Sequence, residues 1–363
     1  MRAGGENDRP AKSEAGFLLA DQERYALDSA LKTSPIVSPE LFALLKTVSR
    51  SFYLSVRFLP KRIRQTIALA YLLARASDTI ADTNRLAADR RLQVLANLSG
   101  SIAKGGDPGD LSECIAAQAD GSEKTLLDKV PLLCRKVGEL PESHRALVRE
   151  VLAKIIHGQT LDIERFECRS GTQALPNDAA LEEYTYLVAG CVGEFWTKVC
   201  LLEWPNYSSL KEGALLELGR DFGKGLQLVN IVRDFPADLQ AGRSYLPLSD
   251  PEKARTDIAI AKPEWDRWRA RAREYLQSGW KYFRVIRPPR VRFACALPVL
   301  IGLRTLKRLD AESEIRSGVK ISRAEVQWLT LVAAAIAIFP FVEPMIANRW
   351  QIADSGRADR AAT

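Results

Sequence analysis

Histidines are few in this sequence, and closely spaced cysteine pairs are absent from it. The 363 residues include two histidines and six cysteines, and no two cysteines stand in a CxxC arrangement. Structural zinc sites use four cysteine or histidine ligands at short, characteristic spacings, so the sequence argues against such a site. A chain this long can build a large apolar core without disulfides, and we therefore expect the cysteines to be buried, reduced thiols.

Two further absences concern the compartment and the partner. Residues 1–15 contain no apolar stretch of the kind that forms the core of a secretory signal, which predicts a cytosolic chain whose membrane contacts are made from that side. Basic runs interleaved with aromatic residues are also missing, so nucleic acid is not an expected partner. The net charge of +7 suits an anionic ligand without identifying it.

Strand-like alternation of Val, Ile and Thr is rare, whereas helical spacing of apolar residues dominates from Pro39 onward. The glycines of Gly219–Gly225 fall inside a helical pattern rather than after a strand, so no Rossmann domain is expected. We predict an all-α protein with a loosely ordered leader over residues 1–34, one helical domain over 35–350 and a flexible tail over 351–363. The expected helices are Glu40–Arg50, Pro60–Thr83, Ala87–Ala103, Glu123–Gly138, Glu142–Phe166, Ala179–Leu202, Ser208–Arg233, Lys262–Val285, Phe293–Leu309 and Arg323–Phe339.

A pair of aspartates follows an apolar helical segment. Tyr71, Arg75, Asp78 and Asp82 recur at spacings that place them on one stripe of a helix, and their apolar neighbours suggest that the stripe lines an interior. Two carboxylates buried without compensation would be strongly unfavourable, but a hard divalent cation with oxygen ligands removes that cost. The plainer alternative for one such pair is an exposed polar face with a capping aspartate.

A second segment repeats this arrangement. Gln227, Asn230, Asp234 and Asp238 again share one helical stripe. Pro236 interrupts it, because proline lacks the backbone donor and disfavours helical geometry in the residue before it. We therefore predict that the helix kinks or ends there and that Asp238 points away from the line of a straight helix.

Together the two stripes suggest one shared cavity. Facing pairs of aspartates can bind a cluster of Mg²⁺ ions, or Mn²⁺, which bridge to a diphosphate and neutralise it as it leaves. Arg75 and Arg233 lie beside the pairs, and Arg243 follows on a short loop, so each can bond to diphosphate oxygens. Ionisation of an allylic diphosphate leaves a carbocation, which requires an apolar, dry cavity. The residues alone predict metal-assisted ionisation of a prenyl diphosphate.

From about Leu44 to Val326 the chain resembles the squalene/phytoene synthase family. The resemblance implies a class I isoprenoid synthase helical bundle around a central cavity. The motifs that carry it are Ser49-Arg50-Ser51-Phe52, Asp78 to Asp82, Tyr184 to Gly193, Asn230 to Asp238 and Arg243 to Pro247.

The resemblance also implies roles for individual residues. Tyr184 is the candidate proton-handling tyrosine, and it joins the four aspartates as the expected catalytic set. Metal ligation is expected from Asp78, Asp82, Asp234, Asp238 and Asn230. Diphosphate binding is expected from Ser49, Arg50, Ser51, Tyr71, Arg75, Gln227, Arg233 and Arg243.

The implied reaction is a Mg²⁺-dependent head-to-head (1′-1) condensation of two farnesyl diphosphates through a cyclopropyl intermediate, presqualene diphosphate. Reduction by NADPH then gives squalene. Cys295–Pro298 and the basic segment Gly318–Arg323 resemble the squalene synthase versions, with Lys320, Arg323 and Asn230 expected near the nicotinamide. Ser322 departs from the pattern, because it stands where an arginine is expected, and Lys320 and Arg323 can alternatively be a helix-entry charge pair.

Several alternatives remain open at this stage. A phytoene or dehydrosqualene synthase would use the same fold without the reduction, and a catalytically silent relative would act as a scaffold. Gln159 and Asp162 either face the cavity or face solvent.

An apolar run, Val326–Val342, lies near the end of the sequence. It is shorter than the roughly 20 residues that a spanning helix needs, and Pro340 interrupts it. We therefore favour a core or interfacial helix over a membrane span. Because substrate and product would be very apolar, contact with a membrane surface is expected.

Overall fold

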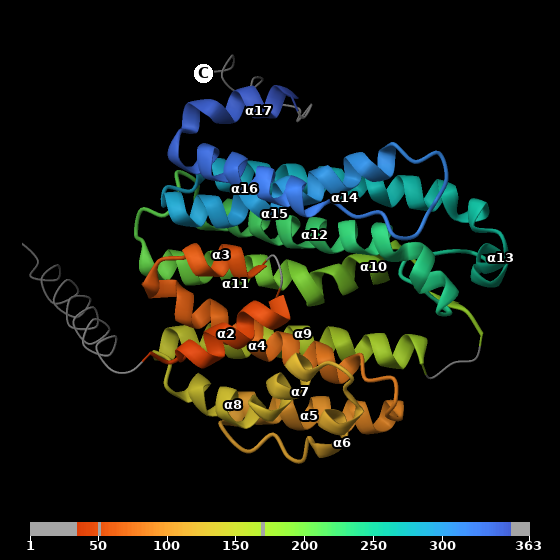
Figure 1. Cartoon of the computed structure of the whole chain (residues 1–363), viewed down its shortest axis with the longest axis horizontal. Coiled ribbons are helices and arrows are strands. Elements are labelled where there is room, and N and C mark those ends of the chain that lie inside the picture. Colours follow the sequence, from red (N-terminus) through yellow and green to blue (C-terminus); the bar gives the residue numbers. More distant parts are fainter. Residues whose placement is uncertain (1–34, 50–51, 168–170, 350–363) are drawn as a thin grey trace, which may run out of the picture.

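The computed structural model describes residues 35–49, 52–167 and 171–349, and its elements are helices with one pair of short strands (Figure 1). The predicted leader over 1–34 and tail over 351–363 lie outside the described residues. The first half contains α2 (Pro39–Ser49), α3 (Phe52–Phe58), α4 (Lys61–Ala81), α5 (Ala88–Lys104), α6 (Ser112–Ala117), α7 (Gly121–Asp128), α8 (Val130–Gly138), α9 (Glu142–Phe166), β1 (Gln173–Ala174), α10 (Asp178–Thr185) and the π-helix η1 (Tyr186–Gly190).

The second half is helical as well. It contains α11 (Cys191–Glu203), α12 (Glu212–Gln240), β2 (Arg243–Ser244), α13 (Pro251–Thr256), the 3₁₀ turn η2 (Ile258–Ala261), α14 (Lys262–Val285), α15 (Pro289–Asp310), α16 (Arg323–Ile338), the 3₁₀ turn η3 (Pro340–Val342) and α17 (Glu343–Arg349). The all-α prediction is confirmed.

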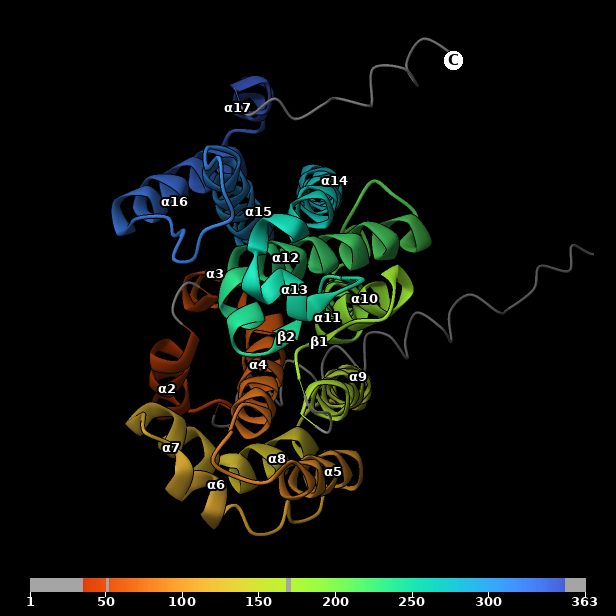
Figure 2. The same cartoon turned by 90° about the vertical axis from the view of Figure 1, so that its right-hand side faces the viewer.

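Two groups of helices face each other across the middle of the molecule. Figures 1 and 2 place α12, α14, α15 and α16 on one side and α4, α5, α8 and α9 on the other. Between them α10, η1 and α11 lie along one flank, and α3 lies on the opposite flank (Figure 2). Helices from both groups and from both flanks contribute side chains to one cavity at this central space.

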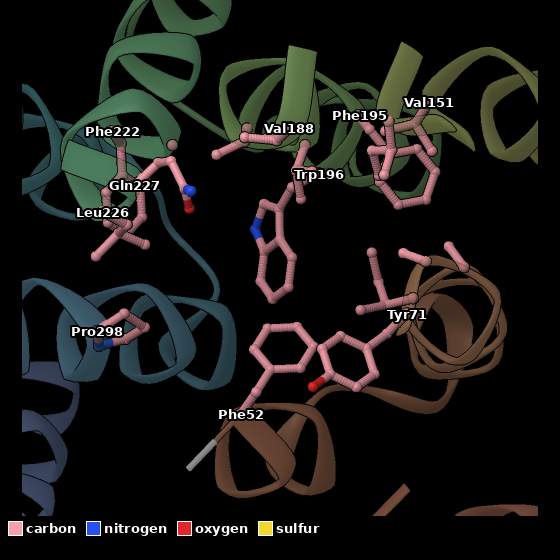
Figure 3. Close-up of a pocket in the computed structure, with 18 of the residues that line it drawn as sticks. Phe52, Tyr71, Val151, Val188, Phe195, Trp196, Phe222, Leu226, Gln227 and Pro298 are labelled. Atoms are coloured by element: carbon pink, nitrogen blue, oxygen red, sulfur yellow. The ribbon is translucent and has the colours of Figure 1, made fainter. Parts of the chain in front are cut away.

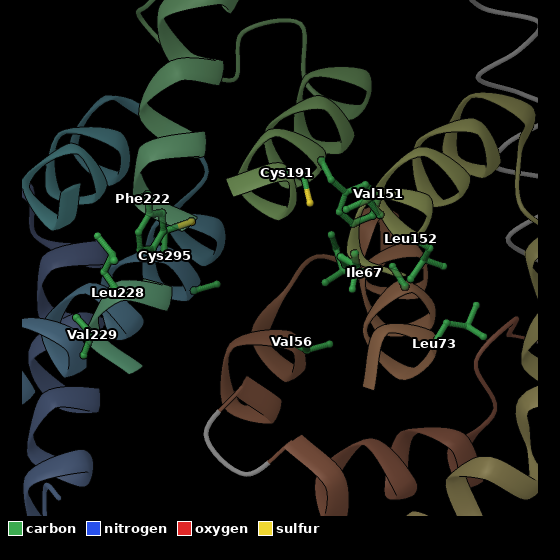
Figure 4. Close-up of a cluster of buried hydrophobic side chains, with 14 of the residues drawn as sticks. Val56, Ile67, Leu73, Val151, Leu152, Cys191, Phe222, Leu228, Val229 and Cys295 are labelled. Carbon is green, nitrogen blue, oxygen red and sulfur yellow. The ribbon is translucent and has the colours of Figure 1, made fainter. Parts of the chain in front are cut away.

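The buried apolar side chains of both groups approach this central space. Ile67 of α4 and Val151 of α9 belong to one wall, and Phe222 of α12 and Cys295 of α15 belong to the other (Figure 4). Five of the six cysteines are described, and all five are buried and free of disulfides, which agrees with the expectation from the sequence. They are Cys114, Cys134, Cys191, Cys200 and Cys295.

Several predicted helices need correction. The expected helices Glu142–Phe166 and Lys262–Val285 match α9 and α14, but Glu123–Gly138 is two helices that meet at Lys129. The expected helix Ala179–Leu202 is interrupted by one π-helical turn, η1. Such a turn is a π-bulge, in which the helix holds one extra residue. The short helices α3, α6, α13 and α17 were not predicted, because short helices are stabilised by packing rather than by their own sequence pattern.

Pro236 does not end its helix, so of the two predicted outcomes, a kink or an end, the end is wrong. Helix α12 continues to Gln240 with Pro236 buried inside it. The proline cannot donate to the carbonyl of Val232, one turn earlier, but the indole Nε1 of Trp265 donates to that same oxygen at 2.7 Å. Because the bond lost at the proline is replaced from α14, the helix extends far enough to carry Asp238.

Helix α12 lies unusually close to η1 and α11. A Cβ atom added at Gly193 would overlap the carbonyl oxygen of Gly219, and one added at Gly223 would overlap that of Ala189. Two backbones in contact cannot move apart without shifting a cavity wall.

We therefore expect Gly193→Ala to lower the free energy of unfolding by about 3 kcal/mol through overpacking. Gly100→Ala is the matched control, since no atom lies within 4 Å of the added Cβ in α5. In urea unfolding followed by circular dichroism the control should be neutral or slightly stabilising, as alanine favours a helix more than glycine does. Equal stability of the two variants would contradict the close contact.

The C-terminal apolar run forms α16, which ends at Ile338 rather than continuing as one helix to residue 342. Its 16 residues are fewer than a membrane span requires. One stretch of the described residues, Asp178–Glu203, is long and apolar enough to cross a membrane, but it packs between α9 and α12 in the centre of the molecule. That position accounts for its apolar composition.

Candidate active site

The central space is a cavity of about 800 Å³, within the range of about 300–1,000 Å³ that is usual for small-molecule sites. Its apolar walls come from α3, α4, α9, η1, α11, α12 and α15 (Figure 3). Most of its polar lining comes from the C-terminal halves of α4 and α12, where both aspartate segments lie. The cavity lining includes seven of the residues expected at the site, namely Ser49, Tyr71, Arg75, Asp78, Tyr184, Gln227 and Asn230.

The first aspartate pair lies at the end of α4. Asp78 forms an ion pair with Arg75, which also pairs with Glu123 at 2.7 Å. Desolvation raises the pKa of Asp78 although Arg75 opposes the rise. Asp82 is the exposed C-cap residue of α4. Desolvation by the surrounding protein, together with the negative charge of Asp78, nevertheless raises the pKa of Asp82 to about 6. Two carboxylates are thus held close together in a partly dehydrated place.

The second pair lies on the last turns of α12. Asp234 accepts from Arg233 at 2.5 and 2.8 Å, and Asp238 accepts from Nε of Arg243 at 3.0 Å. Burial raises the pKa of Asp238 although Arg243 opposes the rise. These four residues and Asp82 do not line the cavity itself. Asp82 follows the lining residue Asp78 at the end of α4. Arg233, Asp234 and Asp238 follow the lining residue Asn230 along α12, whereas Arg243 lies in β2.

Arg243 connects the two pairs electrostatically. Besides bonding to Asp238, its positive charge opposes the rise that burial causes in the pKa of Asp82 and of Asp162. It is held there by Gly242, whose φ of +86° ends α12 in the left-handed region that favours glycine. The adjoining strand β2 then pairs with β1 in parallel, with Arg243 opposite Gln173.

Helix α9 contributes two side chains whose orientation the sequence left open. Gln159 lines the cavity, and its Oε1 is buried without a hydrogen-bond partner among the described residues. Asp162 accepts from the hydroxyl of Tyr245 at 3.0 Å through Oδ2, while its Oδ1 is buried and unpaired. Burial raises the pKa of Asp162 to about 6. Gln159 lines the cavity and Asp162 bonds to Tyr245, so both are further candidate site residues.

Two tyrosines are fixed by ring contacts. Tyr184 is buried in the cavity lining and stacks on Tyr245 with ring centroids 4.7 Å apart. Burial raises its pKa well above 10, so its hydroxyl stays protonated over any usable pH range. Tyr71 stacks on Phe52 with centroids 4.6 Å apart, and burial raises its pKa to about 12.

Of the three residues expected near a nicotinamide, Asn230 lines the cavity and the other two lie outside its lining. Lys320 and Arg323 are exposed and do not line the cavity, and the carbonyl of Lys320 accepts from Arg308 at 2.9 Å. Ser322, which replaces an expected arginine, caps α16 in a capping box with Glu325. A serine there has a structural reason, because its hydroxyl satisfies a free backbone donor of the first helical turn. The predicted site residues Arg50 and Ser51 lie outside the described residues.

The donor atoms suit a hard cation. Carboxylate and amide oxygens from α4, α9 and α12 are the ligands that Mg²⁺ and Mn²⁺ prefer. In the described part of the chain, no three acidic, cysteine or histidine side chains are grouped closely enough to enclose a metal ion. Asp78, Asp234 and Asp238 are each turned toward an arginine instead. Gln159 and Asp162 each have a buried oxygen without a hydrogen-bond partner, and these oxygens are available as ligands. The residues therefore fit such a cation.

The pKa of Asp82 predicts a pH-dependent requirement for Mg²⁺. Since this pKa is about 6, the side chain is ionised at neutral pH and protonated in mild acid. A proton competes with the metal for the same oxygens, so the Mg²⁺ concentration for half-maximal turnover should rise about tenfold per pH unit below about pH 6. Magnesium titrations across this range measure the effect. In Asp82→Asn the Mg²⁺ requirement should depend much less on pH. A pH-independent requirement in the unmodified protein would contradict the assignment of Asp82 as a metal ligand.

Comparisons with known proteins point in the same direction. The family model described as "Squalene/phytoene synthase" matches residues 45–325. A squalene synthase from Yarrowia lipolytica is 22% identical over 82% of this chain and 67% of its own length. A bifunctional lycopene cyclase/phytoene synthase from Phaeosphaeria nodorum is 26% identical over 66% of this chain, which corresponds to only 39% of that protein.

Solved structures share the fold. A structure titled as TcSQS with the ligand E5700 superposes with a TM-score of 0.67 at 20% identity, over 81% of this chain and 85% of that one. A dehydrosqualene synthase complex superposes with a TM-score of 0.55 at 20% identity, over 87% and 98% of the two chains. The family model covers most of the chain, and it includes both aspartate segments and the helices that form the cavity. This protein therefore belongs to the squalene/phytoene synthase family, whose members are prenyltransferases.

Proposed function

We propose that residues 35–350 form one catalytic domain that condenses two molecules of farnesyl diphosphate head to head, in a Mg²⁺-dependent reaction through presqualene diphosphate. NADPH then reduces the intermediate to squalene. The observation that carries this proposal is a single apolar cavity whose polar lining includes residues from both aspartate segments. Such a cavity holds hydrocarbon in its interior and anionic diphosphate at the carboxylates and arginines.

Bound Mg²⁺ would supply the positive charge that neutralises the departing diphosphate. The aspartates Asp78, Asp82, Asp234 and Asp238, with Asn230, would hold it. Their arginine partners are then free to bond to diphosphate oxygens, because a carboxylate bound to metal no longer needs a guanidinium beside it. The remaining polar groups of the lining, Ser49, Tyr71 and Gln227, would orient the diphosphate together with Arg50 and Ser51.

The apolar cavity walls would protect the carbocation from water. Apolar side chains such as Val151, Val188 and Leu226 exclude water, which would otherwise capture the cation and end the reaction. The hydroxyl of Tyr184 remains protonated and is positioned by its stacking on Tyr245, so it can donate a hydrogen bond and take part in proton transfer at the reacting carbons.

The reductive step is assigned to NADPH with support from Asn230, Lys320 and Arg323. Asn230 lies in the cavity lining, and the two cations lie on the exposed segment that leads into α16. Because their side chains are exposed, they are accessible to the phosphate groups of a dinucleotide.

Product analysis tests the proposal. Purified protein is incubated with Mg²⁺ and farnesyl diphosphate, with and without NADPH, and the extract is separated by chromatography. Squalene that forms only with NADPH is the expected result. A dehydrosqualene peak that is unaffected by NADPH, or reaction with geranylgeranyl diphosphate alone, would instead identify a dehydrosqualene or phytoene synthase. No product from either substrate would favour a silent scaffold protein.

We also propose that the apolar surface of α16, η3 and α17 contacts a membrane surface. Trp328, Leu331, Ile338, Phe339, Phe341 and Met345 are between 48% and 73% exposed. They form most of the large exposed apolar side chains in the described part of the chain. An exposed apolar surface of this kind fits the interfacial region of a bilayer, where an apolar product can leave without crossing water.

Sedimentation with anionic lipid vesicles should measure this contact. The double variant Leu331→Asp, Phe341→Asp should bind vesicles at least about tenfold more weakly, because two apolar side chains no longer enter the bilayer. Ile260→Asp changes an exposed apolar residue of η2 and should leave binding unchanged. Equal binding by all three proteins would rule out this surface.

A further inference from the structure

Trp196 extends across the centre of the cavity. It belongs to α11, and Figure 3 shows its indole pointing from that helix into the cavity toward Phe52 of α3. Figure 2 places α11 and α3 on opposite flanks of the space between the two helix groups. An indole from one flank and a phenyl ring from the other therefore approach each other across the cavity.

The lining on either side of this indole comes from different walls. Phe222, Leu226 and Pro298 belong to α12 and α15, on one side of Trp196 in Figure 3. Tyr71 and Val151 belong to α4 and α9, on the other side. The indole thus separates an α12–α15 half of the cavity from an α4–α9 half.

The surrounding contacts give the indole N–H of Trp196 only a weak partner. This N–H is buried and has no nitrogen or oxygen acceptor among the described residues, and its side-chain partner is the thiol of Cys295 on α15. A thiol sulfur is a weak acceptor, so it offsets the burial of the donor only in part. Leucine or phenylalanine would line an apolar wall without a donor that needs a partner. The property that distinguishes tryptophan here is the size of its ring system.

We propose that Trp196 is a specificity-determining residue that limits the prenyl chains to the length of farnesyl by separating the two halves of the cavity. The proposal rests on the proposed condensation of prenyl diphosphates. A geranylgeranyl chain is one five-carbon unit longer than a farnesyl chain, so two such chains need room for two extra units. Those units together are about as large as an indole, so removal of the indole creates room of that size.

Substitution by residues of decreasing size tests this role. The ratio of kcat/KM for geranylgeranyl diphosphate to that for farnesyl diphosphate is measured in the unmodified protein and in Trp196→Phe, Trp196→Leu and Trp196→Ala. The ratio should rise in the order of lost volume, by about tenfold to a hundredfold for alanine. Trp204→Leu, at a partly buried tryptophan outside the cavity lining, is the control and should keep the original ratio.

The leucine variant separates size from aromatic character. If the ring face stabilises a carbocation, leucine and alanine lose turnover with both substrates while phenylalanine keeps it, and the chain-length ratio does not change. That result would overturn the proposal. Circular dichroism and the unfolding midpoint show which variants remain folded.

A binding measurement keeps this test separate from the test of the proposed function. If the unmodified protein converts neither diphosphate, the proposed function is wrong. Titration calorimetry with the unreactive farnesyl and geranylgeranyl thiodiphosphates then still tests the cavity. Trp196→Ala should favour the longer analogue by about tenfold relative to the unmodified protein. An unchanged preference would overturn the role of Trp196.

Discussion

Asp78→Asn should lower kcat by about a thousandfold at saturating Mg²⁺, because loss of one anionic ligand removes several kcal/mol of charge stabilisation from the departing diphosphate. Asparagine keeps the shape and one oxygen of the side chain but not its charge. Asp78 also lines the cavity directly, unlike Asp82 or Asp238, so its replacement acts where the diphosphate is expected. Steady-state turnover of farnesyl diphosphate over a range of Mg²⁺ concentrations measures the loss.

The same substitution should leave the metal-free protein at least as stable as the original. Desolvation raises the folded-state pKa of Asp78 above its usual value, so ionisation at neutral pH works against folding, and a neutral side chain removes that cost. Asp128→Asn, on an exposed aspartate of α7, is the control and should retain full turnover. If Asp78→Asn kept turnover within about tenfold of the control, the metal assignment would be wrong.

Tyr184→Phe should lower turnover by about a hundredfold to ten thousandfold, the usual contribution of a positioned proton-transfer group. The substitution preserves the ring that stacks on Tyr245 and removes only the hydroxyl. Because burial keeps that hydroxyl protonated, the loss should be the same across the usable pH range. Single-turnover experiments that follow presqualene diphosphate locate the affected step in the first half of the reaction.

A neighbouring tyrosine provides a matched control. The hydroxyl of Tyr186 bonds to Glu194 at 3.2 Å and to Lys154 at 3.1 Å, and Tyr186 does not line the cavity. Tyr186→Phe makes the same chemical change two residues away and should keep most of the activity. Equal losses in the two variants would indicate a structural effect on η1 and α10 rather than a role for the Tyr184 hydroxyl.

The sequence alone predicted the helical class and seven of the polar residues that line the cavity. Asp78 and Asp82 are on one stripe because helical spacing fixes side-chain direction within a single helix. The same reasoning placed Gln227 and Asn230 together, and both line the cavity. Local periodicity carries this information, since it depends only on residues a few positions apart.

Other features depended on contacts between distant segments. Pro236 was predicted to kink or end α12, and the helix does not end there. Trp265 supplies the missing hydrogen bond from another helix, and no pattern near the proline indicates that partner. Likewise, Asp162 was left open between cavity and solvent until Tyr245, 83 positions away, was found to bond to it. Lys320 and Arg323 were expected near the nicotinamide, and the structure shows that both are exposed and outside the cavity lining.

By itself the sequence determined which residues share a helical face, which are charged and which pattern of motifs they form, because these are properties of short segments. Only the tertiary structure decided that Trp196 extends across the cavity and that Arg243 acts on both aspartate pairs. It also decided that each pair contains an aspartate in an ion pair with an arginine. The physical reason is that helix–helix packing sets these relations, through backbone contacts such as that of Gly193 with Gly219. Packing of this kind joins residues that are far apart in the chain.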